Sequence, residues 1–178
     1  AEDEYRRVIL TGLWLADTEL DLGGRRRIGQ TGYELLTPLR TVSGKTYLIN
    51  RGWVPMELKD PAKRPDDEAL SGDEITLTGM IRLPREAHFF TPENHPEKNF
   101  WFTVDIPAME LATGITFEPY TIEIQGKLND LKHQKFPVPA ESDVVFRNDH
   151  LGYALTWAML AVAAAIVGWL RLRKSANA

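Results

Sequence analysis

The stretch GYELLTPLRTVSGKTYLIN, residues 32–50, holds two runs rich in β-branched, aromatic and leucine side chains, separated by Ser43 and Gly44. Such side chains favour extended backbone, and a Ser-Gly pair between two runs of this kind is typical of a tight turn. The stretch therefore predicts a β-hairpin with strands over residues 32–41 and 46–50.

Further runs of the same kind recur on both sides of the hairpin. They cover residues 8–15, 74–82, 100–104 and 120–124. Segments 56–73 and 126–142 are instead rich in Pro, Asp, Lys and Gly, and we expect them to be loops. The alternation of short strands and loops predicts a domain that is mostly β-sheet.

One helix is expected among these strands. Asp105 can act as its N-cap, Pro107 fits the first turn, and Gly114 can end it after the run AMELAT. The predicted fold class is mainly β (α+β), a small antiparallel β-barrel or curled sheet with one packed helix.

The C-terminal stretch FRNDHLGYALTWAMLAVAAAIVGWLRLRK, residues 146–174, predicts a transmembrane helix. Residues 151–170 carry no formal charge, and 20 residues in a helix cross a hydrocarbon core of about 30 Å. Tyr153 and Trp169 stand near the two ends, where amphipathic rings collect at membrane interfaces. The lipid bilayer is therefore an expected partner of this segment.

The charges around the span predict its orientation. Arg171, Arg173 and Lys174 follow it, and basic residues concentrate on the cytoplasmic side of membranes. We expect residues 1–146 to form an extracytoplasmic domain, 147–170 a transmembrane helix with a polar cap, and 171–178 a cytoplasmic tail. The domain would lie in the bacterial periplasm or, alternatively, in the mitochondrial intermembrane space.

Export of such a domain needs a signal, yet residues 1–30 contain no signal peptide or apolar run that could export it, and the chain begins with Ala1. We therefore expect that an N-terminal signal or a first transmembrane helix precedes these residues in the whole protein.

Composition and motifs argue against several functions. The formal net charge is −4 and no basic stripe interleaves with aromatic residues, so nucleic acid is not an expected partner. The chain has no cysteine, which removes thiolate chemistry and disulfides. A metal site of His88, Glu93 and His95 is disfavoured because the spacing matches no compact ligand set. No hydrolase or nucleotide-binding motif indicates an enzyme.

His150 lies at the start of the predicted span, with Tyr153 and Trp157 on the same helical face. Small residues continue that face, and the opposite side carries larger apolar residues: Leu151, Leu155, Met159, Val162 and Ile166. The His150 imidazole could ligate a metal centre, with the aromatic rings packing beside it. Alternatively, His150 is an interfacial residue that only hydrogen-bonds lipid headgroups.

Arg51, in the segment YLINRGWVP, also has two interpretations. Its guanidinium could bind carboxylates, with Trp53 as a flat packing surface. Alternatively, Asn50 and Gly52 form a turn, and Arg51 merely stacks on Trp53.

Four segments in order resemble the surfeit locus protein 1 family of cytochrome c oxidase assembly factors: GYELLTPLR, YLINRGWVP, FTPENHPEKNFWFTVDIPAM and RNDHLGYALTW. The resemblance covers nearly the whole chain. It implies a β-rich domain between two transmembrane helices and a non-enzymatic role in maturing the oxidase. The family's transmembrane histidine falls on His150. Where members often carry Asn-Asn-His, this chain has Asn148-Asp149-His150, and Gly152 replaces a bulky residue.

The resemblance also implies a cofactor and partners. The chain would bind haem A and present it to subunit I of cytochrome c oxidase, with haem A synthase as a further partner. His150 would supply an axial nitrogen to the haem iron, Tyr153 and Trp157 would pack the macrocycle, and Arg147 or Arg51 would meet the propionates. The alternative is a cofactor-free scaffold that stabilises an oxidase subunit during assembly.

Overall fold

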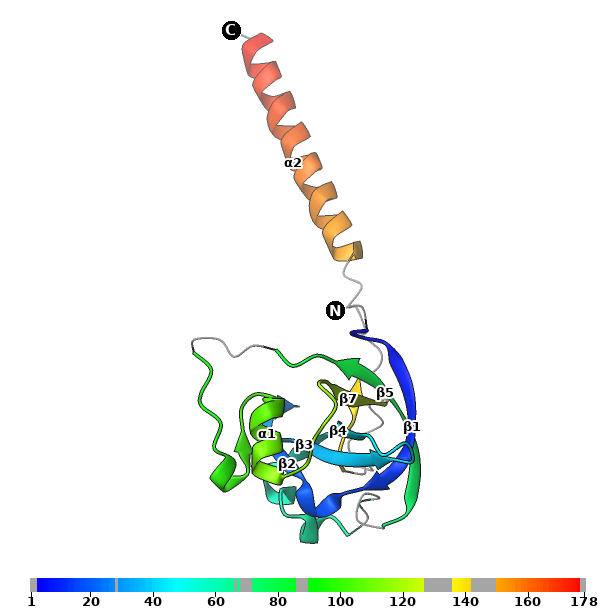
Figure 1. Ribbon diagram of the computed structural model, residues 1–178. Helices are drawn as coiled ribbons and strands as arrows, with labels where there is room; N and C mark the ends of the chain where they lie inside the picture. Colours follow the sequence, from blue (N-terminus) through cyan, green and yellow to red (C-terminus); the bar gives the residue numbers. More distant parts are fainter. Residues whose placement is uncertain are drawn as a thin grey trace. The chain divides into compact units, whose positions relative to one another are not determined.

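The computed structural model describes residues 3–27, 29–65, 67, 72–85, 90–126, 136–141 and 150–176. The chain divides into two compact units, Ala1–Asp143 and Val144–Ala178. Figure 1 shows the strands and the short helix α1 of the first unit and the long helix α2 of the second.

The first unit is built around a five-stranded barrel. Its strands are β1 (Arg7–Trp14), β3 (Gln30–Thr41), β4 (Thr46–Pro55), β5 (Glu74–Arg82) and β7 (Thr121–Gly126). They pair in the order β1-β5-β7-β4-β3, and β1 also pairs with β3, which closes the barrel. The predicted barrel is thereby confirmed. It is mixed rather than wholly antiparallel, because β4 and β7 run parallel.

Strand β3 is long enough to pair with two strands, one after the other, along one of its edges. Its first half pairs with β2 (Leu20–Arg27), and its last residues pair with β1 through Leu39, Arg40 and Thr41. Beyond β2 the sheet ends in β6 (Phe100–Trp101), while β8 (Ala140–Glu141) pairs with β7. The sheet therefore extends past the barrel on the side of β2.

The predicted hairpin is confirmed as β3 and β4. Gly44 takes a φ of 84°, which a glycine adopts without strain, and the Thr41 N–H donates to the Lys45 carbonyl oxygen at 2.9 Å. The predicted turn at Asn50 and Gly52 is wrong. Strand β4 continues through both residues, and a β-bulge opposite Leu35 and Leu36 absorbs the irregularity there.

The single short helix α1 (Ile106–Thr113) has the predicted ends. The Asp105 carboxylate accepts from the Ala108 N–H at 3.1 Å, and Gly114 ends the helix in the left-handed conformation. The 56–73 segment contains no strand in its described part, only the 3-10 turns η2 (Met56–Leu58) and η3 (Pro61–Lys63). Two further 3-10 turns are η1 (Ala16–Thr18) and η5 (Pro96–Lys98).

Two apolar clusters hold this unit together. One fills the barrel and takes residues from all five of its strands: Trp14, Leu39, Ile49, Leu77, Ile81 and Ile122. The other lies on the outer face of the sheet, where α1 covers β2, β3 and β4 (Figure 1). Its buried members are Leu20, Leu22, Leu36, Leu48, Trp101, Ile106, Met109 and Phe117. Helix α1 thus shields from water the apolar part of the outer sheet face.

The second unit contains one continuous helix, α2 (His150–Ala176). Within it, Gly152–Arg173 is long and apolar enough to cross a membrane.

Candidate functional site

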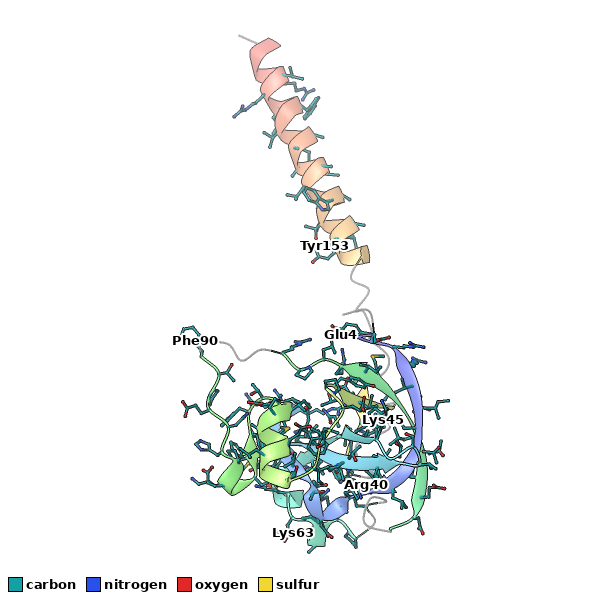
Figure 2. The ribbon with its side chains drawn as sticks, in the orientation of Figure 1. Glu4, Arg40, Lys45, Lys63, Phe90 and Tyr153 are labelled. Carbon is teal, nitrogen blue, oxygen red and sulfur yellow. The ribbon has the colours of Figure 1, made fainter. Side chains whose placement is uncertain are left out.

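Helix α2 carries most of the predicted site residues. The side chains of Tyr153 and Trp157 are 68% and 70% exposed, and Figure 2 shows Tyr153 projecting near the start of the helix. They are four positions apart, so they share one face. His150 is the first residue of the helix, although the described side chains begin at Gly152. Arg147 lies outside the described residues.

The remainder of α2 is also exposed from Gly152 to Arg173. Small residues Ala161, Ala164 and Gly168 continue the face of Tyr153 and Trp157, while Leu155 and Met159 lie toward the other side. A helix this apolar needs lipid, another helix or a flat apolar ligand to cover it. The Arg173 guanidinium lies 4.2 Å from the Trp169 ring centre, a pairing suited to the polar end of a span.

Arg51 lies in the other unit, inside a buried cluster of ion pairs. Its Nε donates to the Thr37 hydroxyl at 2.7 Å, and its two terminal nitrogens donate to Asp67 and Glu19. Arg64 pairs with the same two carboxylates, reaching Asp67 Oδ2 at 2.8 Å. The four charged side chains are between 1% and 9% exposed. Each of the two arginines thus pairs with both carboxylates, while Arg64 Nε is buried without a hydrogen-bond partner in the described part of the chain.

These contacts give Arg51 a structural role, although both parts of the predicted interpretation, the turn and the stacking on Trp53, are wrong. The guanidinium lies over Trp14, 5.6 Å from the ring centre, and not over Trp53. Trp53 instead donates from Nε1 to the Arg25 carbonyl oxygen at 3.2 Å. A carboxylate from outside could reach Arg51 only by displacing a buried partner, which is costly because it leaves a charge uncompensated.

Asp21, next to this cluster, is a buried carboxylate with an altered pKa. Burial raises the pKa of Asp21 to about 6, against the lowering effect of Lys59, whose Nζ lies 3.3 Å from Oδ2. The Asn99 amide also donates to Oδ2, at 3.2 Å. The Asp21 carboxyl group therefore takes up a proton at a mildly acidic pH.

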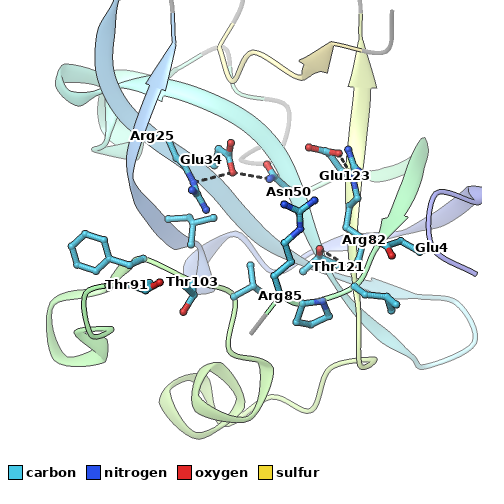
Figure 3. A pocket seen from close by; sticks show the side chains of 15 residues that line it. Glu4, Arg25, Glu34, Asn50, Arg82, Arg85, Thr91, Thr103, Thr121 and Glu123 are labelled. Carbon is cyan, nitrogen blue, oxygen red and sulfur yellow. Dashed lines mark hydrogen bonds and ion pairs between the residues drawn. The ribbon is translucent and has the colours of Figure 1, made fainter. Parts of the chain in front are cut away.

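A row of polar side chains crosses the outer face of the sheet and lines a cleft of about 490 Å³ (Figure 3). Ile49, Ile81 and Ile122 point into the barrel, so the residue after each points outward. The row follows the strand order β5-β7-β4-β3-β2, and its members are Arg82, Glu123, Asn50, Glu34 and Arg25. Sequence reasoning missed this row because its members come from five separate strands.

Hydrogen bonds and ion pairs connect most of the row. Arg82 Nε donates to Glu123 Oε2 at 2.7 Å. The Asn50 amide donates to Glu34 Oε2 at 3.2 Å, and Arg25 Nε lies 3.5 Å from the same oxygen. Asn50 thus lies between two ion pairs, and in each pair the carboxylate is the member nearer to Asn50 in the row (Figure 3).

The disfavoured metal site gains no support from the described residues. They contain no group of three or more His, Asp or Glu side chains arranged to hold a metal ion. His95 Nδ1 lies 3.4 Å from Glu97, and His88 and His133 fall outside the described part of the chain.

The fold defines a class of protein in which a mixed β-barrel unit with one packed helix precedes a candidate membrane helix. A family model, the SURF1 family, matches residues 1–162, and the chain belongs to this family, which is known for cytochrome oxidase assembly factors.

Curated relatives agree with this assignment. A SURF1-like protein of Monosiga brevicollis is 30% identical over 98% of this chain and 68% of its own length. A SURF1-like protein of Rickettsia felis is 29% identical over 92% of this chain and 71% of its own length. Human Surfeit locus protein 1 is 36% identical over a match that covers 75% of this chain and 43% of the human protein.

Proposed function

We propose that this chain binds haem A and presents it to subunit I of cytochrome c oxidase, with haem A synthase as the donor. The observation that carries the proposal is helix α2 of a SURF1-family chain, which begins at His150 and exposes Tyr153 and Trp157 on one apolar face. The role is coordination and delivery, so no bond-making residue is required.

The residues of α2 fit such a ligand. Two exposed aromatic rings four positions apart offer flat apolar surface, and Ala161 and Ala164 beyond them leave room for a broad planar molecule. A His150 nitrogen would hold the iron, which supplies the axial coordination chemistry when haem is bound. Arg147 would hold a propionate where the span meets water. Arg51 is not included, because its donors are already taken up within the barrel unit.

The proposal places the barrel unit on the extracytoplasmic side, in the periplasm or the mitochondrial intermembrane space. It rests on the basic residues that follow the span, Arg171, Arg173 and Lys174.

The test compares His150→Ala with Leu155→Ala in the whole protein, purified in detergent from cells that make haem A. His150→Ala removes the nitrogen ligand and should lower haem content or shift the Soret band. Leu155→Ala removes apolar volume from the other side of the helix and should leave the spectrum unchanged. Thermal unfolding of both variants should match the wild type, because the barrel unit keeps its own core.

Equal haem content and equal spectra in both variants would overturn the haem proposal. That outcome favours a cofactor-free scaffold, for which Ala161, Ala164 and Gly168 form a small-residue face suited to close helix packing. Substituting Ala164→Leu would then weaken co-purification of the oxidase subunit, while Val162→Leu would not.

A further inference from the structure

The polar cleft of Figure 3 continues into a second cleft beside α1. The second cleft measures about 510 Å³ and shares four lining residues with the first: Pro84, Arg85, Thr103 and Val104. Both are open to solvent. They therefore form one groove, which we call the 84–119 groove, polar at one end and more apolar at the other.

Arg85 stands where the two halves meet. It is exposed, and Figure 3 shows its side chain reaching into the cleft toward Asn50. Among the described residues it has no ion-pair partner. Glu34 is shared by Arg25 and Asn50, and Glu123 is paired with Arg82. A guanidinium fork is thus left available inside a groove.

The remaining carboxylates of the groove are largely engaged elsewhere. Asp105 caps α1, and Glu110 accepts from the Phe117 N–H at 2.7 Å. Glu4 lines the polar end, on the far side of Arg82 in Figure 3. Among the described residues no carboxylate of the groove pairs with Arg85, so its guanidinium is available to a carboxylate of another molecule.

The apolar half offers a surface for a side chain of moderate size. Its lining includes Val104, Pro107, Pro119 and the buried Phe117. The distance from charge to apolar surface is short, because Arg85 and Val104 line both halves.

We propose that the 84–119 groove binds an extended peptide segment of a partner protein, with an Asp or Glu side chain on Arg85 and an apolar side chain against Val104 and Pro119. A groove open to solvent can hold a peptide whose two ends extend beyond it, whereas small molecules are usually enclosed in a pocket. An acidic side chain would form an ion pair with the Arg85 guanidinium. Apolar contacts next to it would add affinity and fix the position of the peptide along the groove.

The test uses fluorescent heptapeptides in a Gly/Ser background with one Glu and one Leu, separated by zero to three residues, and the same peptides with Gln in place of Glu. Binding to the full chain in detergent is measured by fluorescence anisotropy. At least one Glu peptide should bind about tenfold more tightly than its Gln match, a difference of about 1.4 kcal/mol, because a hydrogen bond to a charged group is stronger than one to a neutral group.

Matched variants locate the binding. Arg85→Gln should reduce binding of the Glu peptide to the level of its Gln match, whereas Arg40→Gln, on an exposed part of β3, should not. Glu4→Gln should tighten binding, because it removes a like charge from the groove. Pro119→Asp should weaken binding, whereas Leu111→Asp, on the exposed side of α1, should leave it unchanged.

Three results would overturn the proposal: equal affinity for Glu and Gln peptides, equal effects of Arg85→Gln and Arg40→Gln, or Arg85-dependent binding of decanoate without peptide binding. The last result would assign the groove to a free fatty acid. Haem content of Arg85→Gln should equal that of the wild type, so this test is independent of the haem proposal.

Discussion

Arg51 holds three parts of the barrel unit together. Its guanidinium joins β4 to Thr37 of β3, to Glu19 before β2, and to Asp67 in the segment after η3. The motif YLINRGWVP drew attention to Arg51, but its partners are 14 to 32 positions away in the sequence. Arg64 and Asp67 are only three positions apart, but no local pattern indicates that Glu19 and Arg51 join them, because those contacts depend on the folded topology.

Replacing Arg51 by Lys should therefore destabilise the barrel unit. Arg51 reaches Thr37, Glu19 and Asp67 with three separate nitrogens of its fork, and a single ammonium nitrogen does not reproduce these positions. A buried carboxylate therefore loses a partner, at a cost of about 3 kcal/mol. The measurement is the urea midpoint of the full chain, followed by tryptophan fluorescence. The control Arg40→Lys should stay within about 0.5 kcal/mol of the wild type. An unchanged midpoint for Arg51→Lys would show that the ion pairs contribute no net stability.

The altered pKa of Asp21 makes a second residue-scale prediction. Its folded pKa of about 6 lies above the ordinary 3.8, so the folded protein binds the proton more tightly than the unfolded chain. The stability that this group contributes is present below about pH 4 and is lost as the pH rises through 6. Asp21→Asn should remove that loss, so the variant should gain stability relative to the wild type between pH 4.5 and 7.5.

Urea midpoints at pH 4.5, 6.0 and 7.5 test this. Asp17→Asn, an exposed position in the preceding η1 turn, is the control and should track the wild type at each pH. A constant difference between Asp21→Asn and the wild type would show that Asp21 does not titrate in this range.

At the scale of elements, strands with strong β patterns and the capped helix were predictable. Strand β5 and helix α1 lie where the sequence predicts them, and β1 differs by one residue at each end. Strand β2 was missed, because LDLGGRRR is half polar and glycine-rich, and only pairing with β3 and β6 makes it a strand. The candidate site on α2 could be predicted from the spacing of its residues along one helix. The 84–119 groove could not, because its lining residues come together only when the strands pair.

Gly52 shows why β4 continues where a turn was predicted. Its φ of 117° is one that residues with a Cβ rarely adopt, and a Cβ there would lie 2.0 Å from the Val138 carbonyl oxygen. The next residue, Trp53, exchanges two backbone hydrogen bonds of 2.8 Å with Val138. The glycine thus permits close approach of two backbones within the sheet.

Gly52→Ala should consequently destabilise the barrel unit by about 2 kcal/mol or more, since both the backbone conformation and the contact with Val138 become strained. Differential scanning calorimetry of the full chain measures it. Gly44→Ala, at the hairpin turn, has the φ penalty but nothing within 4 Å of the added Cβ, so it should cost less. Equal losses would mean that the Val138 contact is unimportant.

At the scale of the whole molecule, the barrel unit and the residues after α2 should lie on different sides of a membrane. The chain has no cysteine, so single cysteines report their own location. In cells that make the whole protein, Lys63→Cys on the barrel surface should react with a membrane-impermeant maleimide (Figure 2). Asn177→Cys, after the basic residues, should react only after the membrane is permeabilised. The reverse pattern would place the barrel unit in the cytoplasm.

Strand β7 has a consequence for the order of events during synthesis. It is the last barrel strand in the sequence, yet it lies between β4 and β5, whose edges stay open until it arrives. Residues 127–149 alone separate it from α2, and a ribosome adds them in roughly one to five seconds. The nascent chain thus carries an unpaired edge of β4 from Pro55 onward and an unpaired edge of β5 from Arg82 onward, until β7 is made from Thr121, and such edges are prone to wrong association. The synthesis of the apolar helix thus follows soon after the strand that closes the barrel.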